Sequence, residues 1–344
     1  MKMKLASQIR AWPPIAIAAC LIVLSFPHEL RAQDAQERVT VNNVTRTYLV
    51  HLPEGYDQQQ HYPVVILLHG LNQDPDQMAR LTQFNELADK DSIIAVYPNA
   101  LNGRWSIGLA APAIYRGPYR RGPWGPRYPP PPPRQRRQGA GRPAADLEFF
   151  NQMLDKLSNK YSVDPARVYV AGLGEGGFMA LRVGCNMGDR IAAIAAVAAA
   201  LPKTMNCVAL RPVAVLLMNG TNDPILPHGG GSYKDAPLKV LSAEDSAKYW
   251  ARQNHCAEKP NQTKLPSLQK GFKDTKVYTY DNCQADAQVA LYDVKDGGHT
   301  WPGGEQYMSE KEVGKTSLAL NANETIWSFF VTKKISNASS DADH

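Results

Sequence analysis

The chain has 344 residues and a formal net charge of +6, a length that suits one large α/β domain with a substantial core. After the first 32 residues, no stretch approaches the roughly 18 consecutive apolar residues that a transmembrane helix requires, so a soluble mature protein is expected. The positive charge does not indicate a generally basic surface, because eight arginines and no acidic residue fall in the single segment Arg116–Arg142.

Residues 1–32 have the three regions of a secretory signal peptide. Basic residues open the segment, the apolar run "PPIAIAACLIVLSF" follows, and "LRAQD" ends it. We expect cleavage after Ala32 and a secreted or periplasmic mature chain. Cys20 leaves a lipoprotein as the alternative, although the apolar run continues beyond this cysteine instead of turning polar.

The elements that follow alternate between strands and helices. "RVTV" and "TRTYLVHL" flank "NN" as a hairpin would, and "YPVVILLHG" is typical of a strand buried on both faces. A helical pattern over Asp76–Lys90 precedes the strand "SIIAVYP", and the helix "ADLEFFNQMLDKLSNKY" precedes the strand "RVYVAG". A helix near Phe178, the apolar "IAAIAAVAAA", the strand "PVAVLLMNG", the helix "SAEDSAKYWARQN", the strand "QVALYDV" and a helix around "ETIWSFFV" complete the series. This order predicts the α/β class, a mostly parallel sheet with helices on both faces.

One segment interrupts the alternation. Residues 109–144 are rich in proline, glycine and arginine, and their five consecutive prolines favour an extended chain. Because strands and helices resume on either side, we interpret the segment as a disordered insertion in a single domain of residues 33–334, followed by a polar tail, 335–344. The alternative is an arm that binds a polyanion through its arginines and aromatic residues.

Four cysteines remain once the signal peptide is removed, namely Cys185, Cys207, Cys256 and Cys283. An even number in an exported chain indicates two disulfides, with four buried free thiols as the alternative. Three pairings are open. Sequence order favours Cys185 with Cys207 and Cys256 with Cys283, because short loops are easily closed.

Catalytic chemistry is suggested by three positions that each follow a predicted strand. "AGLGEGG" forms a glycine-rich turn centred on Gly174, Asp223 lies in "NGTNDPILP", and His299 lies in "DGGHTWPGG". An α/β-hydrolase places its nucleophile, acid and histidine in this chain order. "LLHG" ends an earlier strand where such enzymes position a loop amide for the oxyanion, so the amides of Leu71 and Glu175 are the candidate oxyanion-hole donors.

These stretches resemble the secreted polyhydroxybutyrate depolymerase and feruloyl esterase-like group of α/β-hydrolases. That group typically has G-L-S-N-G-G at its turn and G-G-H-T-W-P-G at its histidine, and "AVYPNA", "VDPARVYVAGLGEGG" and "KDGGHTWPGG" match over residues 38 to 332. The resemblance implies an α/β-hydrolase fold, carboxylic-ester hydrolysis without cofactor or metal, and an Asp223 that orients His299. It also supports the disulfide pairing given above.

The chain departs from the group at the nucleophile, where serine is replaced by Gly174. Glycine has no atom that can attack a carbonyl, so a covalent acyl-enzyme cannot form at this turn. We therefore expect an ester hydrolase relative that is inactive or weakly active, or alternatively a binding protein for an aromatic ester, a hydroxyacid oligomer or a polyanion. Trp301 is a candidate for the substrate pocket, with packing as its alternative, and Glu175 could instead offer a catalytic carboxylate.

Overall fold

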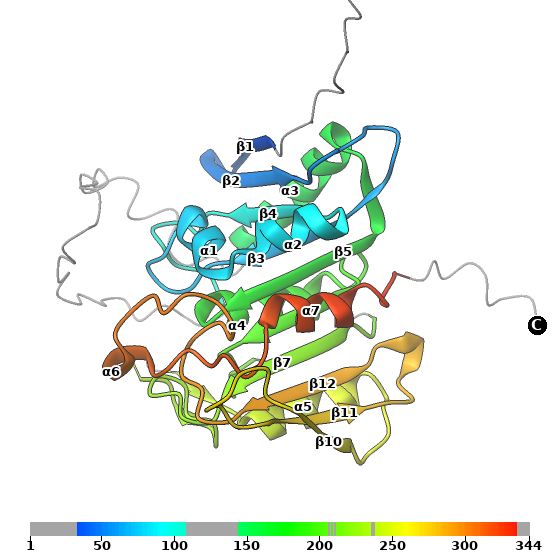
Figure 1. Ribbon diagram of the computed structural model, residues 1–344. Helices are drawn as coiled ribbons and strands as arrows, with labels where there is room; N and C mark the ends of the chain where they lie inside the picture. Colours follow the sequence, from blue (N-terminus) through cyan, green and yellow to red (C-terminus); the bar gives the residue numbers. More distant parts are fainter. Residues whose placement is uncertain are drawn as a thin grey trace, which may run out of the picture.

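The computed structural model describes residues 33–107, 144–205, 207, 209, 211–234 and 238–335. These residues form a central ten-stranded sheet (Figure 1). Its strands lie in the order β1 (Gln33–Val41), β2 (Val44–Leu52), β4 (Ile94–Pro98), β3 (Tyr62–Leu68), β5 (Val163–Leu173), β6 (Ala193–Val197), β7 (Ala214–Gly220), β12 (Val289–Val294), β11 (Thr275–Tyr280) and β10 (Asn261–Leu265). A small ribbon of β8 (Gly231–Ser232) and β9 (Lys239–Val240) lies apart from it.

The middle of the sheet is parallel and its two edges are antiparallel. Strands β4, β3, β5, β6, β7 and β12 pair in parallel, whereas β1–β2–β4 and β12–β11–β10 pair antiparallel. The predicted hairpin joins β1 to β2 through Asn42 and Asn43, whose φ angles of 49° and 62° match a tight two-residue turn that needs positive φ at both positions. The prediction of a mostly parallel sheet is confirmed.

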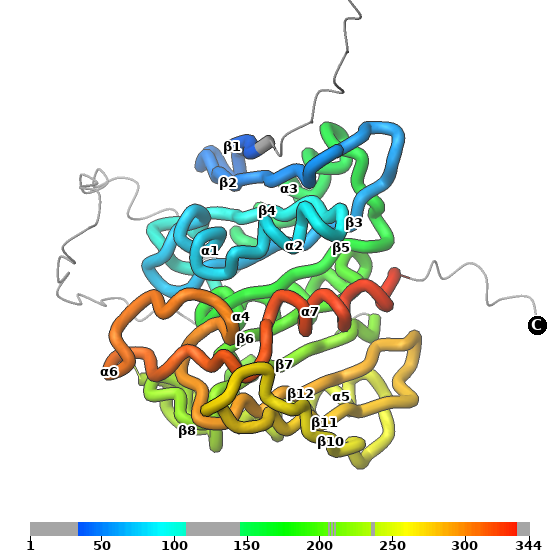
Figure 2. The backbone as a smooth tube through the Cα atoms, in the orientation of Figure 1, coloured from blue at the N-terminus to red at the C-terminus, as the bar shows by residue number. Residues whose placement is uncertain are grey.

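Helices cover both faces of the sheet, and the short helix α6 (Glu310–Val313) lies in the long segment that leads from β12 to α7 (Figure 2). Figure 1 shows α1 (Pro75–Thr82), α2 (Phe84–Asp91) and α7 (Ala322–Phe330) in front, and α3 (Ala144–Lys160), α4 (Glu175–Asn186) and α5 (Ala243–Gln253) behind. Side chains of β3 alternate between the two layers: Val64 and Ile66 pack with the α3, α4 and α5 side, and Val65 packs with the other. This alternation explains why "YPVVILL" is apolar throughout.

Some boundaries differ from the sequence prediction. The helix expected over Asp76–Lys90 is two helices, because Gln83 adopts a left-handed conformation (φ 53°) and its N–H closes the end of α1 on Ala79 O. The helix expected near Phe178 begins at Glu175, directly after the glycine turn. The antiparallel strands β10 and β11 were not predicted. Strand β10 is largely exposed and polar, whereas β11 has the residue types of a strand and was missed.

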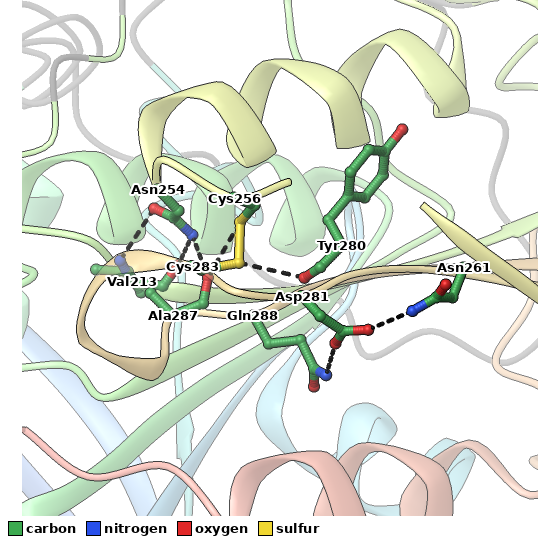
Figure 3. The surroundings of a disulfide bond; sticks show 9 residues. All are labelled: Val213, Asn254, Cys256, Asn261, Tyr280, Asp281, Cys283, Ala287 and Gln288. Carbon is green, nitrogen blue, oxygen red and sulfur yellow. Dashed lines mark hydrogen bonds between the residues drawn. A yellow bond between two sulfur atoms is a disulfide. The ribbon is translucent and has the colours of Figure 1, made fainter. Parts of the chain in front are cut away.

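Both disulfides have the predicted pairing, Cys185 with Cys207 and Cys256 with Cys283. Figure 3 shows the second one, which joins the chain after α5 to the chain after β11. Beside it, the Asn254 amide donates to Val213 O and Ala287 O, both at 2.7 Å. The end of α5 is thus fixed covalently and by hydrogen bonds to the edge of the sheet.

Several predictions fall on residues outside the described part of the chain. These are the signal peptide of residues 1–32, all of the insertion except Ala144, which opens α3, and the tail beyond residue 335. Among the described residues, no helix combines the length and hydrophobicity needed to cross a membrane.

Candidate active site

The glycine turn lies between β5 and α4, as the sequence predicted. Gly174 has φ 55° and ψ −116°, and its N–H donates to Val197 O at 2.9 Å. The flanking glycines permit close backbone contact, since a Cβ on Gly172 would lie 2.3 Å from Gly176 O and one on Gly176 would lie 2.2 Å from Leu68 O. The turn therefore fixes position 174 against the end of the neighbouring strand β3.

Asp223 and His299 follow β7 and β12, which are adjacent parallel strands. The structure brings the two side chains together, with His299 Nδ1 donating to Asp223 Oδ2 at 2.8 Å. The other carboxylate oxygen of Asp223 accepts the N–H groups of Ile225 (2.7 Å) and Leu226 (2.8 Å). Because the carboxylate is held by two backbone amides and is 1% exposed, it fixes both the orientation of the imidazole and the proton on Nδ1.

The imidazole points at Gly174, the position at which the sequence analysis places the nucleophile of related enzymes. A Cβ built on Gly174 would lie 2.7 Å from His299 Nε2, 3.5 Å from Cε1 and 3.8 Å from Cδ2. The nearly equal distances to the two ring carbons place this point close to the axis along which Nε2 accepts a hydrogen bond. The three predicted positions thus lie together. A serine at position 174 would require the His299 ring to move back slightly, because Nε2 lies only 2.7 Å from the Cβ position.

The two candidate oxyanion donors lie at the start of α4 and in the loop after β3. The amide of Glu175 is the first N–H of α4 and has no acceptor within the helix. Leu71 follows β3 in a loop that is held by Gly70 N–H to Gln73 Oε1 (2.8 Å) and Asn72 N–H to Gly103 O (2.9 Å). Since a Cβ on Gly70 would lie 3.5 Å from Leu173 O, this loop lies against the turn. The donor roles stay predictions.

The side chain of Glu175 has a partner that the sequence did not reveal. Its Oε1 accepts from Arg104 Nη2 at 3.1 Å, while Oε2 is buried without a hydrogen bond from the described residues. Burial raises the pKa of the Glu175 carboxyl, and the Arg104 guanidinium opposes this shift. The carboxylate faces the loop after β4. The one indication of this partner in the sequence is the acidic residue inside the glycine-rich turn, because a buried carboxylate needs a positive charge nearby.

That loop is anchored by buried polar groups, which the sequence analysis also missed. Asp146 binds Arg46 Nη1 at 2.7 Å and accepts the Ser106 N–H at 2.6 Å. His69 donates from Nδ1 to Gly70 O (2.8 Å) and accepts the Ala100 N–H at Nε2 (3.1 Å), which requires a neutral ring. Burial lowers the His69 pKa accordingly.

Trp301 does not line a pocket as predicted. Its side chain is 1% exposed and packs in the core on the α1, α2 and α7 side, where its Nε1–H donates to Asn323 Oδ1 at 2.9 Å. The two-residue spacing from His299 placed Trp301 near the site along the chain, but the side chain turns into the core. The packing alternative is the correct one.

Known proteins agree with this architecture. A family model described as "Putative esterase" matches residues 40–301. The chain belongs to this esterase family. A protein of Nocardia uniformis subsp. tsuyamanensis named "Putative esterase NocK" is 28% identical over 92% of this chain and 90% of its own length. Feruloyl esterase B of Piromyces equi is 25% identical over 74% of this chain, which spans 42% of that longer protein.

Solved structures give the same fold. Acetyl xylan esterase from Aspergillus awamori superposes with a TM-score of 0.53 over 86% of this chain and 99% of its own, at 11% sequence identity. The strand order and the helices on both faces are those of an α/β-hydrolase fold. The fold class predicted from the sequence is confirmed.

Proposed function

We propose that this chain is an exported member of the polyhydroxybutyrate depolymerase and feruloyl esterase-like group that hydrolyses esters weakly or not at all. Membership of the esterase family supports the reaction class. The two disulfides support export, because disulfides persist in oxidising compartments. The observation that carries the proposal is the approach of His299 Nε2 to 2.7 Å from the Cβ position of Gly174.

That geometry supports a catalytic pair, Asp223 and His299, whose nucleophile has been replaced by glycine. In a complete triad the histidine would take the proton of a serine hydroxyl, while Asp223 would stabilise the imidazolium. Without the serine, the pair can at most activate a water molecule. Hydrolases whose triad is deleted retain about 10³ to 10⁴ over the uncatalysed reaction, far below a working esterase.

The test is to restore the hydroxyl. Gly174→Ser should increase kcat for a short-chain aryl ester by at least about 10³, because removal of a complete triad costs about 10⁶ and a reinstalled serine need not be ideally placed. Gly174→Ala is the matched control, since it adds the same Cβ without the oxygen. Both variants should lose about 1 to 3 kcal/mol of stability, because a side chain at φ 55° and ψ −116° is strained.

Adding His299→Ala to the serine variant separates triad chemistry from a contaminating esterase. The gain should disappear in this double variant. A folded Gly174→Ser protein that is no more active than the natural chain would contradict the proposal.

A non-catalytic binding protein is the second candidate, and it is favoured by the same missing oxygen. A turn that keeps its oriented histidine and open amides can hold an aromatic ester or a hydroxyacid oligomer without cleaving it. The arginines of Arg116–Arg142 favour an additional polyanion partner, bound through charge and weakened by salt.

A further inference from the structure

The two disulfides differ in their access to solvent. Cys185 and Cys207 are 6% and 0% exposed and belong to the core on the α3, α4 and α5 side. Cys256 and Cys283 are both partly exposed. A dissolved thiol therefore reaches the second disulfide without any opening of the core, and access is one of the conditions for thiol–disulfide exchange.

The second disulfide forms part of the wall of a cavity beside α5. This cavity has a volume of about 420 Å³, within the range of roughly 300 to 1,000 Å³ that is typical of small-molecule sites. Cys256 belongs to its lining, whereas Cys283 does not. Tyr280 also lines the cavity, and Figure 3 shows its side chain close to the disulfide. A molecule in the cavity thus meets Cys256 and not Cys283.

Both signs of charge are present in the lining of the cavity, on Lys248, Arg252 and Glu258. Lys248 is paired with Glu244 at 2.7 Å. Arg252 and Glu258 are exposed, and neither has an ion pair with the described residues. Burial raises the pKa of the Tyr280 hydroxyl, so this group keeps its proton and can donate to a carboxylate. The cavity therefore suits a ligand that carries both a carboxylate and an ammonium group.

We propose that Cys256 is a thiolation site for an amino-acid thiol, either cysteine or a short cysteine peptide, that binds in this cavity. Arg252 pairs with a carboxylate of the ligand, and Glu258 pairs with its ammonium group. The ligand thiolate attacks the sulfur of Cys256, the bond to Cys283 breaks, and Cys283 leaves as a thiolate. The product is a mixed disulfide between the ligand and Cys256. A second ligand thiolate that attacks the ligand sulfur of this product releases a symmetric ligand disulfide and the Cys256 thiolate.

The fold holds both cysteine segments in place when this bond opens. The Asn254 amide donates to Ala287 O at 2.7 Å, and Asn254 O accepts the Gln284 N–H at 2.9 Å. The Ala257 N–H donates to Asp281 O at 2.9 Å. These hydrogen bonds join the chain around Cys256 to the chain around Cys283 without using the sulfurs. Thiolation therefore modifies a protein that stays folded.

The experiment treats the folded mature chain with glutathione, stops the reaction with N-ethylmaleimide and maps the cysteines by mass spectrometry. We expect the first product to carry glutathione on Cys256 and maleimide on Cys283, with an unchanged circular dichroism spectrum. Cys185 and Cys207 should stay joined until the protein is denatured. Equal reaction of the two disulfides in the folded chain, or glutathione on Cys283 in place of Cys256, would overturn the inference.

Two variants test the charges of the cavity. Arg252→Gln and Glu258→Gln should each slow the first step with glutathione about two- to fivefold, the effect of losing one exposed ion pair, and should leave the step with uncharged 2-mercaptoethanol unchanged. Lys270→Gln is the matched control, because Lys270 is exposed and does not line the cavity, and it should alter neither rate. An unchanged rate with glutathione in Arg252→Gln, or an equal change with both thiols, contradicts the proposed site.

Discussion

Removing the charge of Asp146 should destabilise the protein strongly. This carboxylate and Arg46 form an ion pair of 2.7 Å whose side chains are 2% and 4% exposed. Asp146 also accepts the Ser106 N–H, and Arg46 also donates to Asn99 O and lies over the Phe149 ring. Asp146→Asn would leave the guanidinium buried without a counter-charge.

Breaking a buried pair in this way costs about 3 to 5 kcal/mol. Because asparagine keeps an acceptor for one hydrogen bond, we expect Asp146→Asn to cost about 3 kcal/mol. For a chain of this length, that corresponds to a thermal midpoint lower by about 4 to 6 °C. Urea denaturation followed by circular dichroism measures the free energy of unfolding directly.

Two controls test the reasoning. Glu324→Gln breaks an exposed pair with Lys90, whose side chains are 54% and 64% exposed, and should change stability by less than about 1 kcal/mol. The double variant Arg46→Met with Asp146→Leu removes both charges and should recover most of the loss. A loss below about 1 kcal/mol in Asp146→Asn would refute the idea that this pair anchors the loop after β4.

Four further predictions concern two buried carboxylates, the disulfides and the insertion. Glu175→Gln should stabilise the protein at pH 8, because burial raises the pKa of the Glu175 carboxyl in the folded state above its usual 4.5. The stability that the natural carboxyl contributes is complete below pH 4.5 and is lost as the pH rises through the raised pKa. For Glu37, burial is outweighed by hydrogen bonds from Lys156 and Lys160, which lower its pKa to about 2; Glu37→Gln should therefore destabilise at neutral pH, and the difference from the natural chain should vanish as pH falls towards 2 in pH-dependent urea titrations. Thiol titration of the unreduced, denatured mature chain should find almost no reactive thiol, and two or more would contradict the disulfides. Deleting Arg116–Arg142 should leave the thermal midpoint within a few degrees and abolish salt-sensitive binding to a heparin-like polymer, whereas failure to fold would make this segment part of the core.

The backbone positions of the site could be predicted from the sequence, because Gly174, Asp223 and His299 each follow the end of a buried strand. Parallel strands place such residues at one edge of the sheet, where chain order alone identifies them. Side-chain direction could not be predicted in the same way. Trp301 turns into the core, and Arg104 reaches Glu175 from a loop 71 residues earlier in the chain, a contact that local patterns do not encode.

The edges and breaks of the fold were also beyond the sequence patterns. The left-handed Gln83 divides a helix whose apolar spacing is otherwise continuous. Strand β10 is polar because it lies at an exposed edge, and periodicity arguments depend on a buried face. The break at Gln83 and the polar strand β10 both depend on contacts with the rest of the fold, which local sequence patterns do not contain.

The hydrogen bond from Ser106 to Asp146 has a consequence for engineering. It joins two points that are 40 residues apart in the chain, so the fold itself holds together the two ends of whatever sequence connects them. The entropy of closing a flexible connection grows slowly, by about 0.6 kcal/mol for each doubling of its length. This pair of residues is therefore a natural graft point, where a binding peptide or a reporter domain can be exchanged for the native connection within a few residues of the Arg104–Glu175 pair.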